Sequence, residues 1–155
     1  MEHLQKFKYS IDALFGPGVS KLIPKKIDMT FSKKTGRIRT ISSENNLLCT
    51  LRIDGGLAIT PFFAQILIKS KTFRENCVEV SEDAAPFIEE GRSVFSKHVT
   101  KCGKNVRISC DTPVIFSDKV IAVGKALLSY EMINDFQRGV AIKVRDSLKS
   151  REVQK

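Results

Sequence analysis

Arginine and lysine side chains recur without an intervening acid in one stretch of the second half of the chain. In order, they are Arg92, Lys97, Lys101, Lys104 and Arg107. The segment before them, Glu79–Glu90, is acidic instead. Guanidinium and ammonium groups neutralise phosphates, and arginine can also bind two oxygens at once or stack on an exposed base. This separation of acidic from basic side chains along the sequence predicts a polyanion-binding patch. The alternative is a basic face that is only solvated.

Gly91 comes directly before this basic stretch. Because glycine lacks Cβ, a ribose-phosphate chain could approach its backbone and use its amide hydrogen. A helix C-terminus also favours glycine at such a position, so a cap alone explains it too. Phe95 is either a core residue or a platform for base stacking. His98 is either a structural strand histidine or an RNA contact.

A second basic run lies in the first half of the chain. It consists of Lys21, Lys25, Lys26, Lys33, Lys34, Arg37 and Arg39. Arg37 and Arg39 would point the same way from one strand, as a track for a phosphate backbone requires. Simple solubility explains the lysines equally well. The whole chain has 26 Lys and Arg against 17 Asp and Glu, a net charge of +9, which predicts attraction to polyanions.

Patterns for catalysis and metal binding are weaker. His98, Cys102 and Cys110 offer three metal ligands, but their spacing matches no closed zinc module and lacks a fourth ligand. No serine or cysteine nucleophile motif, Walker loop or GxGxxG signature occurs. We therefore expect no catalytic residue, no metal and no cofactor, although an unassigned pocket in a small enzyme stays an open alternative. The four scattered cysteines predict reduced, mostly buried thiols.

The elements that position the first basic run begin with a helix over 2–15. Leu4, Phe7, Ile11 and Leu14 recur there at helical spacing, and Gly16-Pro17-Gly18 ends the helix. Alternation predicts strands at 27–31, 37–41, 47–53 and 57–59. Thr60 and Pro61 are typical of a helix start. The polar stretch 69–76 then suggests a domain boundary.

The second half predicts a short strand at 77–80 and a helix that Ser81 caps and that runs through Glu90. Further strands are expected at 94–102, 106–110, 114–116, 120–123 and 140–145. Gly124 suggests a bulge or bend, and Ser129 a cap for a helical turn over 130–136. The polar tail from Ser147 is expected to be frayed or weakly helical.

Length and hydropathy limit the remaining possibilities. With 155 residues and 42% hydrophobic composition, the chain is long enough for one domain or two small ones with a real core. No apolar run approaches the roughly 18–20 residues that span a bilayer. The N-terminus lacks the apolar core of a signal peptide. We expect a cytoplasmic protein without membrane association.

Three segments of the second half, 82–95, 122–129 and 139–145, resemble a PUA domain, the RNA-binding module named for pseudouridine synthases and archaeosine transglycosylases. The order helix, glycine, strand, hairpin, Ala-Val-Gly and final strand matches over 76–146. Segments 14–18, 32–39 and 54–57 resemble the companion pre-PUA domain. Together they are similar to the C-terminal half of archaeal tRNA-guanine (archaeosine) transglycosylases. One departure is Cys110-Asp111, where the family often has Gly-Asp.

The resemblance implies an α+β fold, with a pre-PUA α/β sandwich over 1–75 and a PUA pseudo-β-barrel with short helices over 76–155. In such domains the first helix, the following glycine and strand, and the last strand hold structured RNA. The residues matching that cleft are Gly91, Arg92, Ser93, Phe95, Lys97, His98, Lys143 and Arg145. The secondary basic track consists of Lys33, Lys34, Arg37 and Arg39.

The function implied is a non-catalytic RNA-binding component accessory to tRNA modification, with tRNA as its RNA. Transglycosylases of this family need a barrel domain with a carboxylate nucleophile and a zinc site, for which this chain is too short. The chain would therefore act as the RNA-gripping half of a split archaeosine transglycosylase, with a separate catalytic subunit as partner. The alternative is a protein–protein adaptor in ribosome or ribonucleoprotein assembly. The sequence leaves the oligomeric state and the contacted nucleotides open.

Overall fold

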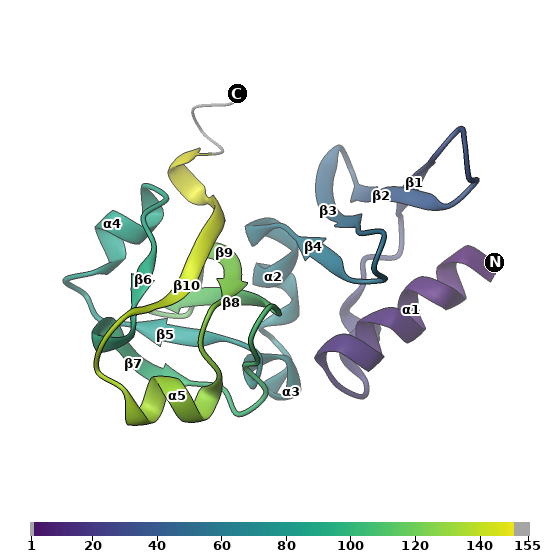
Figure 1. Ribbon diagram of the computed structural model, residues 1–155. Coiled ribbons are helices and arrows are strands. Elements are labelled where there is room, and N and C mark those ends of the chain that lie inside the picture. Colours follow the sequence, from purple (N-terminus) through teal and green to yellow (C-terminus); the bar gives the residue numbers. More distant parts are fainter. Residues whose placement is uncertain (1, 151–155) are drawn as a thin grey trace. The chain divides into compact units, whose positions relative to one another are not determined.

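The computed structural model describes residues 2–150 of the chain and divides it into two compact units, Met1–Phe73 and Arg74–Lys155 (Figure 1). We call them the first and the second unit. Part of the tail on which we predicted fraying or weak helix, residues 151–155, lies outside the described residues.

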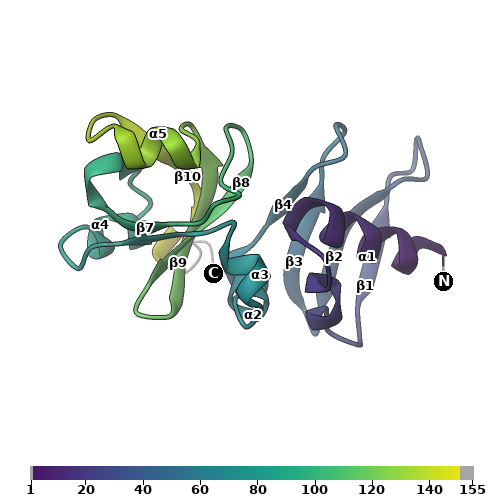
Figure 2. The same cartoon turned by 90° about the horizontal axis from the view of Figure 1, so that it is seen from below.

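The first unit pairs an antiparallel sheet with short helices. Its elements are α1 (Glu2–Phe15), the 3-10 helix η1 (Val19–Leu22), β1 (Asp28–Phe31), β2 (Ile38–Ser43), β3 (Asn46–Leu51), β4 (Leu57–Ile59), α2 (Pro61–Leu67) and α3 (Lys71–Arg74). The strands follow one another in the order β1-β2-β3-β4. Helix α1 lies across one face of this sheet (Figure 2), and Phe7 of α1 stacks on Phe63 of α2 with ring centroids 6.2 Å apart.

The predicted helix over 2–15 is confirmed, and its cause is visible in the packing. Phe7, Ile11 and Phe15 recur on one side of α1 and are buried, as helical periodicity requires. Gly16 ends the helix with φ +128, and a Cβ there would meet the Thr72 methyl carbon at 2.2 Å. Thr60 caps α2 as predicted, because its side chain accepts a hydrogen bond from the Phe63 amide.

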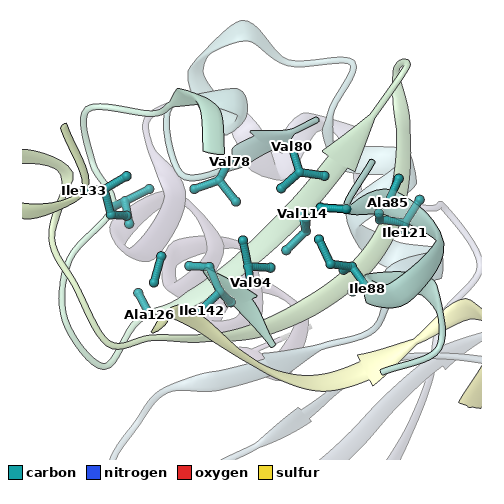
Figure 3. Packing of buried hydrophobic residues seen from close by; sticks show 14 residues of the cluster. Val78, Val80, Ala85, Ile88, Val94, Val114, Ile121, Ala126, Ile133 and Ile142 are labelled. Atoms are coloured by element: carbon teal, nitrogen blue, oxygen red, sulfur yellow. The ribbon is translucent and has the colours of Figure 1, made fainter. Parts of the chain in front are cut away.

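The second unit is a nearly closed barrel. Its elements are β5 (Val78–Val80), α4 (Ala85–Glu89), β6 (Val94–Phe95), the 3-10 helix η2 (Ser96–His98), β7 (Val99–Cys102), β8 (Asp111–Phe116), β9 (Lys119–Ala126), α5 (Tyr130–Asp135) and β10 (Val140–Ser147). The strand order is β6-β10-β9-β8-β5-β7, with β5 and β8 parallel. Side chains from opposite strands, such as Val78, Val94 and Ile142, meet in one core (Figure 3). The predicted α+β class is therefore confirmed.

Two strand predictions in the second unit are wrong. The expected strand 94–102 is interrupted by η2, where the Ser96 hydroxyl donates to the Phe136 carbonyl at 2.6 Å. This hydrogen bond joins η2 to the C-cap residue of α5, 40 residues further along the chain. The expected strand 106–110 is a series of turns, with Ser109 at φ 74.

Two local predictions about glycine and serine also need correction. Strand β9 runs straight through Gly124, and the register shift lies opposite, between Val144 and Asp146 of β10. A Cβ at Gly124 would come within 2.3 Å of the Lys143 carbonyl oxygen, so close approach of two backbones explains this glycine. Ser81 does not cap α4 through its side chain. That helix begins at Ala85, and no hydrogen bond of the Ser81 hydroxyl occurs within residues 2–150.

Candidate nucleic-acid interface

The end of α4 shows what Gly91 does in the fold. Gly91 has φ +104, and its amide donates to the Ile88 carbonyl at 2.9 Å. The Arg92 amide donates to the Phe87 carbonyl at 3.1 Å. Together these are the two hydrogen bonds of a Schellman cap. The amide that we expected a phosphate to use is therefore already engaged, and that part of the prediction is wrong.

Arg92 and Lys97 present cations on either side of β6. The Arg92 guanidinium lies over the exposed Phe87 ring, 5.5 Å from its centroid. A cation–π contact at such an exposed site is worth only about 0.5–1 kcal/mol, so a phosphate can compete for this guanidinium. Lys97 is exposed on η2, and Ser93 is half-buried just before β6.

Pairing of β6 with β10 brings two distant groups of predicted residues together. Val94 lies opposite Ile142, and Phe95 lies opposite Val140. Lys143 is exposed on β10, and its register partner on β9 is the exposed Lys125. Sequence reasoning missed Lys125, although it is the one charged residue that interrupts the apolar run from Val120 to Leu128. We call Arg92, Lys97, Lys125 and Lys143 the barrel surface.

Arg145 was also predicted to contact RNA, but the structure gives its charge a protein partner. One guanidinium nitrogen, Nη2, lies 2.7 Å from the Asp111 carboxylate, and that side chain is only 3% exposed. A buried carboxylate needs such compensation. Arg145 therefore links β10 to β8, and its charge is already balanced by Asp111.

The two aromatic candidates lie at the two ends of η2, with Phe95 just before it and His98 as its last residue. Phe95 is 48% exposed, so its interpretation as a core residue is wrong. Its ring meets the His98 ring edge-on, with centroids 6.5 Å apart. His98 is half-buried at the end of η2 rather than within a strand. Exposed rings of this kind can stack on unpaired bases.

Two thiols of the second unit, those of Cys77 and Cys102, are shielded by burial. Burial raises the pKa of the Cys77 thiol far above its usual range. Burial, and then the Glu131 carboxylate, raise the pKa of Cys102 to about 11. Both thiols are protonated at neutral pH, and it is the thiolate that attacks or binds metal. Between residues 2 and 150, no three His, Cys, Asp or Glu side chains gather as metal ligands.

In the first unit, the secondary basic track follows the β1–β2 hairpin. Lys33 and Lys34 are exposed at its turn. Arg37 lies just before β2 and Arg39 within it, both exposed on either side of the buried Ile38. The two arginines therefore leave the backbone on the side away from the core.

No helix within residues 2–150 is both long and apolar enough to cross a lipid bilayer.

Family models match both halves of the chain. Residues 8–72 match the patch-forming domain C2 of tRNA-guanine transglycosylase, and residues 76–148 match the PUA domain. A tRNA-guanine(15) transglycosylase from Methanobrevibacter smithii is 38% identical over 96% of this chain, which spans 23% of that relative. A second, from Methanosphaera stadtmanae, is 39% identical over 86% of the chain and 19% of the relative. The chain thus spans about a fifth of the curated relatives it matches.

Solved structures support the fold. A hypothetical protein from Pyrococcus horikoshii OT3 matches with a TM-score of 0.75 at 21% identity. The match covers 99% of this chain and 96% of the P. horikoshii chain. A PUA domain from Aeropyrum pernix K1 matches with a TM-score of 0.66 at 12% identity. The match covers 93% of this chain and 80% of the A. pernix chain. The two family matches identify residues 8–72 as a C2 patch-forming domain of the tRNA-guanine transglycosylase type and residues 76–148 as a PUA domain.

Proposed function

We propose that these residues are a non-catalytic RNA-binding component of tRNA modification, with the C2 domain over 1–75 and the PUA domain over 76–155. The observation that carries the proposal is the match of 96% of this chain to a relative named tRNA-guanine(15) transglycosylase, of which it spans only 23%. A part of an enzyme that carries a PUA domain and no assignable catalytic group is suited to hold the RNA on which the rest acts.

The barrel surface supports RNA as the ligand. Its four cations lie on β6, β9, β10 and their flanks, and β10 pairs with both of the other strands. Each phosphate that such a cation neutralises releases a bound counterion, so affinity grows with the number of contacts. The exposed Phe95 ring, with the half-buried His98 ring edge-on to it, adds a place beside Lys97 where an unpaired base can stack.

We propose further that the catalytic domain acts in trans and that this chain raises the local concentration of tRNA at its active site. A pull-down from native extract with the tagged chain is expected to recover a transglycosylase catalytic subunit. Repeated recovery without one would contradict this part of the proposal.

The RNA-binding proposal is tested by mobility shift with unfractionated tRNA. We expect Arg92→Gln combined with Lys97→Gln to weaken binding about tenfold, because two charge-assisted phosphate contacts are lost. The matched control is Lys71→Gln with Lys119→Gln, which removes the same charge from exposed positions outside the barrel surface and outside the predicted basic stretch. Equal affinities of the two double variants would place the RNA elsewhere. No tRNA binding by the unaltered chain would favour the protein–protein adaptor.

A further inference from the structure

The first unit contains a groove that the barrel surface does not explain. It lies between the β1–β2 hairpin and the turn after β3 and has a volume of about 360 Å³. Ligand pockets usually measure about 300–1,000 Å³, so it has room for one small unit of a larger ligand. We call it the hairpin groove.

Arginines form the rim of the hairpin groove. Arg37, Arg39 and Arg52 line it, and its lining contains no carboxylate. Arg37 and Arg39 form no ion pair with any residue in the described range 2–150. Asp54, the acid nearest in sequence to Arg52, accepts a hydrogen bond from the Gly56 amide at 2.8 Å. Arg37 and Arg39 therefore give the groove positive charge that no described residue pairs, and the complement of such charge is an anion.

The floor and one wall are apolar. Ile53 is 95% exposed at the tip of the turn, Leu51 is half-buried, and Ile38 is buried beneath them. A single exposed isoleucine is ordinary on a protein surface. Here, however, it continues an apolar strip that is bordered by guanidinium groups. A ligand that fits must carry an apolar face directly beside negative charge.

Two hydroxyl groups add hydrogen-bond donors at the hairpin end. Ser32 Oγ accepts a hydrogen bond from the Thr35 amide, and Thr35 Oγ1 accepts one from the Arg37 amide, both at 3.4 Å. Within residues 2–150 neither O–H donates to another group, so each proton can be offered to a ligand oxygen. Hydroxyl and guanidinium donors together are the usual partners of phosphate oxygens.

We propose that the hairpin groove binds one unpaired nucleotide of RNA. The phosphates on either side of the nucleotide lie against Arg37 and Arg39, and its base or sugar lies over Ile53 and Leu51. An unpaired nucleotide fits because only an unstacked base presents a free apolar face, whereas a duplex hides these faces within its stack. The inference rests on the proposed RNA-binding function and adds a second contact, on the other domain.

The test is a comparison of two double variants in the full chain. Arg37→Gln with Arg39→Gln is expected to weaken binding of unfractionated tRNA about tenfold. The slope of log K against log salt is expected to fall by about 1.4, which is the loss of two single-strand phosphate contacts. Lys6→Gln with Lys69→Gln removes the same charge from exposed positions of the first unit that do not line the groove and that lie outside the secondary basic track. We expect this control to stay within about twofold of the unaltered chain at physiological salt.

Ile53→Ser separates the apolar contact from the charge. Because Ile53 is almost fully exposed, the substitution leaves the melting temperature unchanged. We expect tRNA affinity about threefold to tenfold lower with an unchanged salt slope. A blunt-ended RNA duplex of matched length is expected to bind the unaltered chain and Ile53→Ser equally well, since it offers no unpaired base.

The outcomes distinguish this inference from the proposed function. If the unaltered chain binds tRNA but the arginine and lysine double variants bind equally well, the hairpin groove is not an RNA site, while the barrel surface can still be one. If Ile53→Ser lowers the affinity for the duplex as much as the affinity for tRNA, the ligand of the groove is not an unpaired nucleotide. If the unaltered chain binds no RNA, both proposals fail together.

Discussion

The barrel surface and the hairpin groove are both basic, yet they differ in what their arginines already contact. Beside the barrel surface, Arg145 is paired with Asp111 at 2.7 Å and Arg92 lies over the Phe87 ring. In the hairpin groove, no carboxylate lines the site. An arginine on a basic face can therefore be held by an acid within the fold, as Arg145 is, or have no carboxylate beside it, as in the hairpin groove.

The Arg145–Asp111 link also explains how the barrel surface keeps its shape. Asp111 of β8 is the register partner of Lys125 on β9, which in turn is the partner of Lys143 on β10. The ion pair therefore joins the two strands that flank β9. The charge of Arg145 is thus engaged inside the barrel, between the two strands on either side of Lys125.

The largest effect in this comparison is expected from Arg145→Gln. The change leaves the Asp111 carboxylate, only 3% exposed, without its cation, and the free energy of unfolding should fall by about 2–3 kcal/mol. Urea denaturation measures this. Arg37→Gln serves as control, with an expected change within about 0.5 kcal/mol. Unchanged stability together with a loss of tRNA binding would make Arg145 a ligand-binding residue instead.

A smaller loss of stability is expected from Gly91→Ala. With φ +104 the position disfavours any residue that has a Cβ, so we expect a loss of about 1–2 kcal/mol in thermal or urea unfolding. Gly91→Asn should recover part of this loss, because asparagine tolerates positive φ better. If Gly91→Ala instead leaves stability intact and weakens tRNA binding, close approach of RNA is the reason for the glycine.

Lys125→Gln tests whether the barrel surface extends onto β9. The residue is exposed, so stability should not change, while tRNA affinity should fall about threefold through loss of one phosphate contact. Lys119→Gln on the same strand is the matched control and is expected to bind as the unaltered chain does. Equal effects of the two would mean that only the overall charge of β9 matters.

The smallest expected effect is the pH dependence of stability that comes from Cys102 on β7, the edge strand at the other end of the sheet from β6. Cys102 has a folded-state pKa of about 11 against an ordinary value of 9.0. Since the unfolded chain ionises first, its contribution to stability is full below pH 9 and is lost as the pH rises to about 11. At pH 8, alkylation should modify the exposed Cys110 well before Cys102. Faster modification of Cys102 would contradict its burial.

Local patterns predicted much of the fold. Periodicity located α1, and cap residues located the starts of α2 and α5, where Ser129 accepts from the Met132 amide. The strand break at η2 could not be predicted, because it depends on a hydrogen bond from Ser96 to a carbonyl 40 residues away. Contacts between residues so far apart cannot be predicted from the residues next to either partner.

The candidate site was predictable only in its charges. Arg92, Lys97 and Lys143 carry exposed charge as basic residues usually do, and their role in RNA binding stays a prediction. The pairing of Arg145 with Asp111 spans 34 residues and three strands, so composition could not separate it from the others. Phe95 was misjudged because a strand aromatic usually faces the core, whereas β6 is an edge strand two residues long.

The central claim is that this chain holds tRNA through several phosphates, and the salt dependence of tRNA affinity tests it most directly. For 6–10 phosphate contacts, we predict that affinity falls roughly 10³–10⁵-fold between 50 and 200 mM salt. An affinity that hardly changes across this range would contradict the account and favour a protein-binding adaptor.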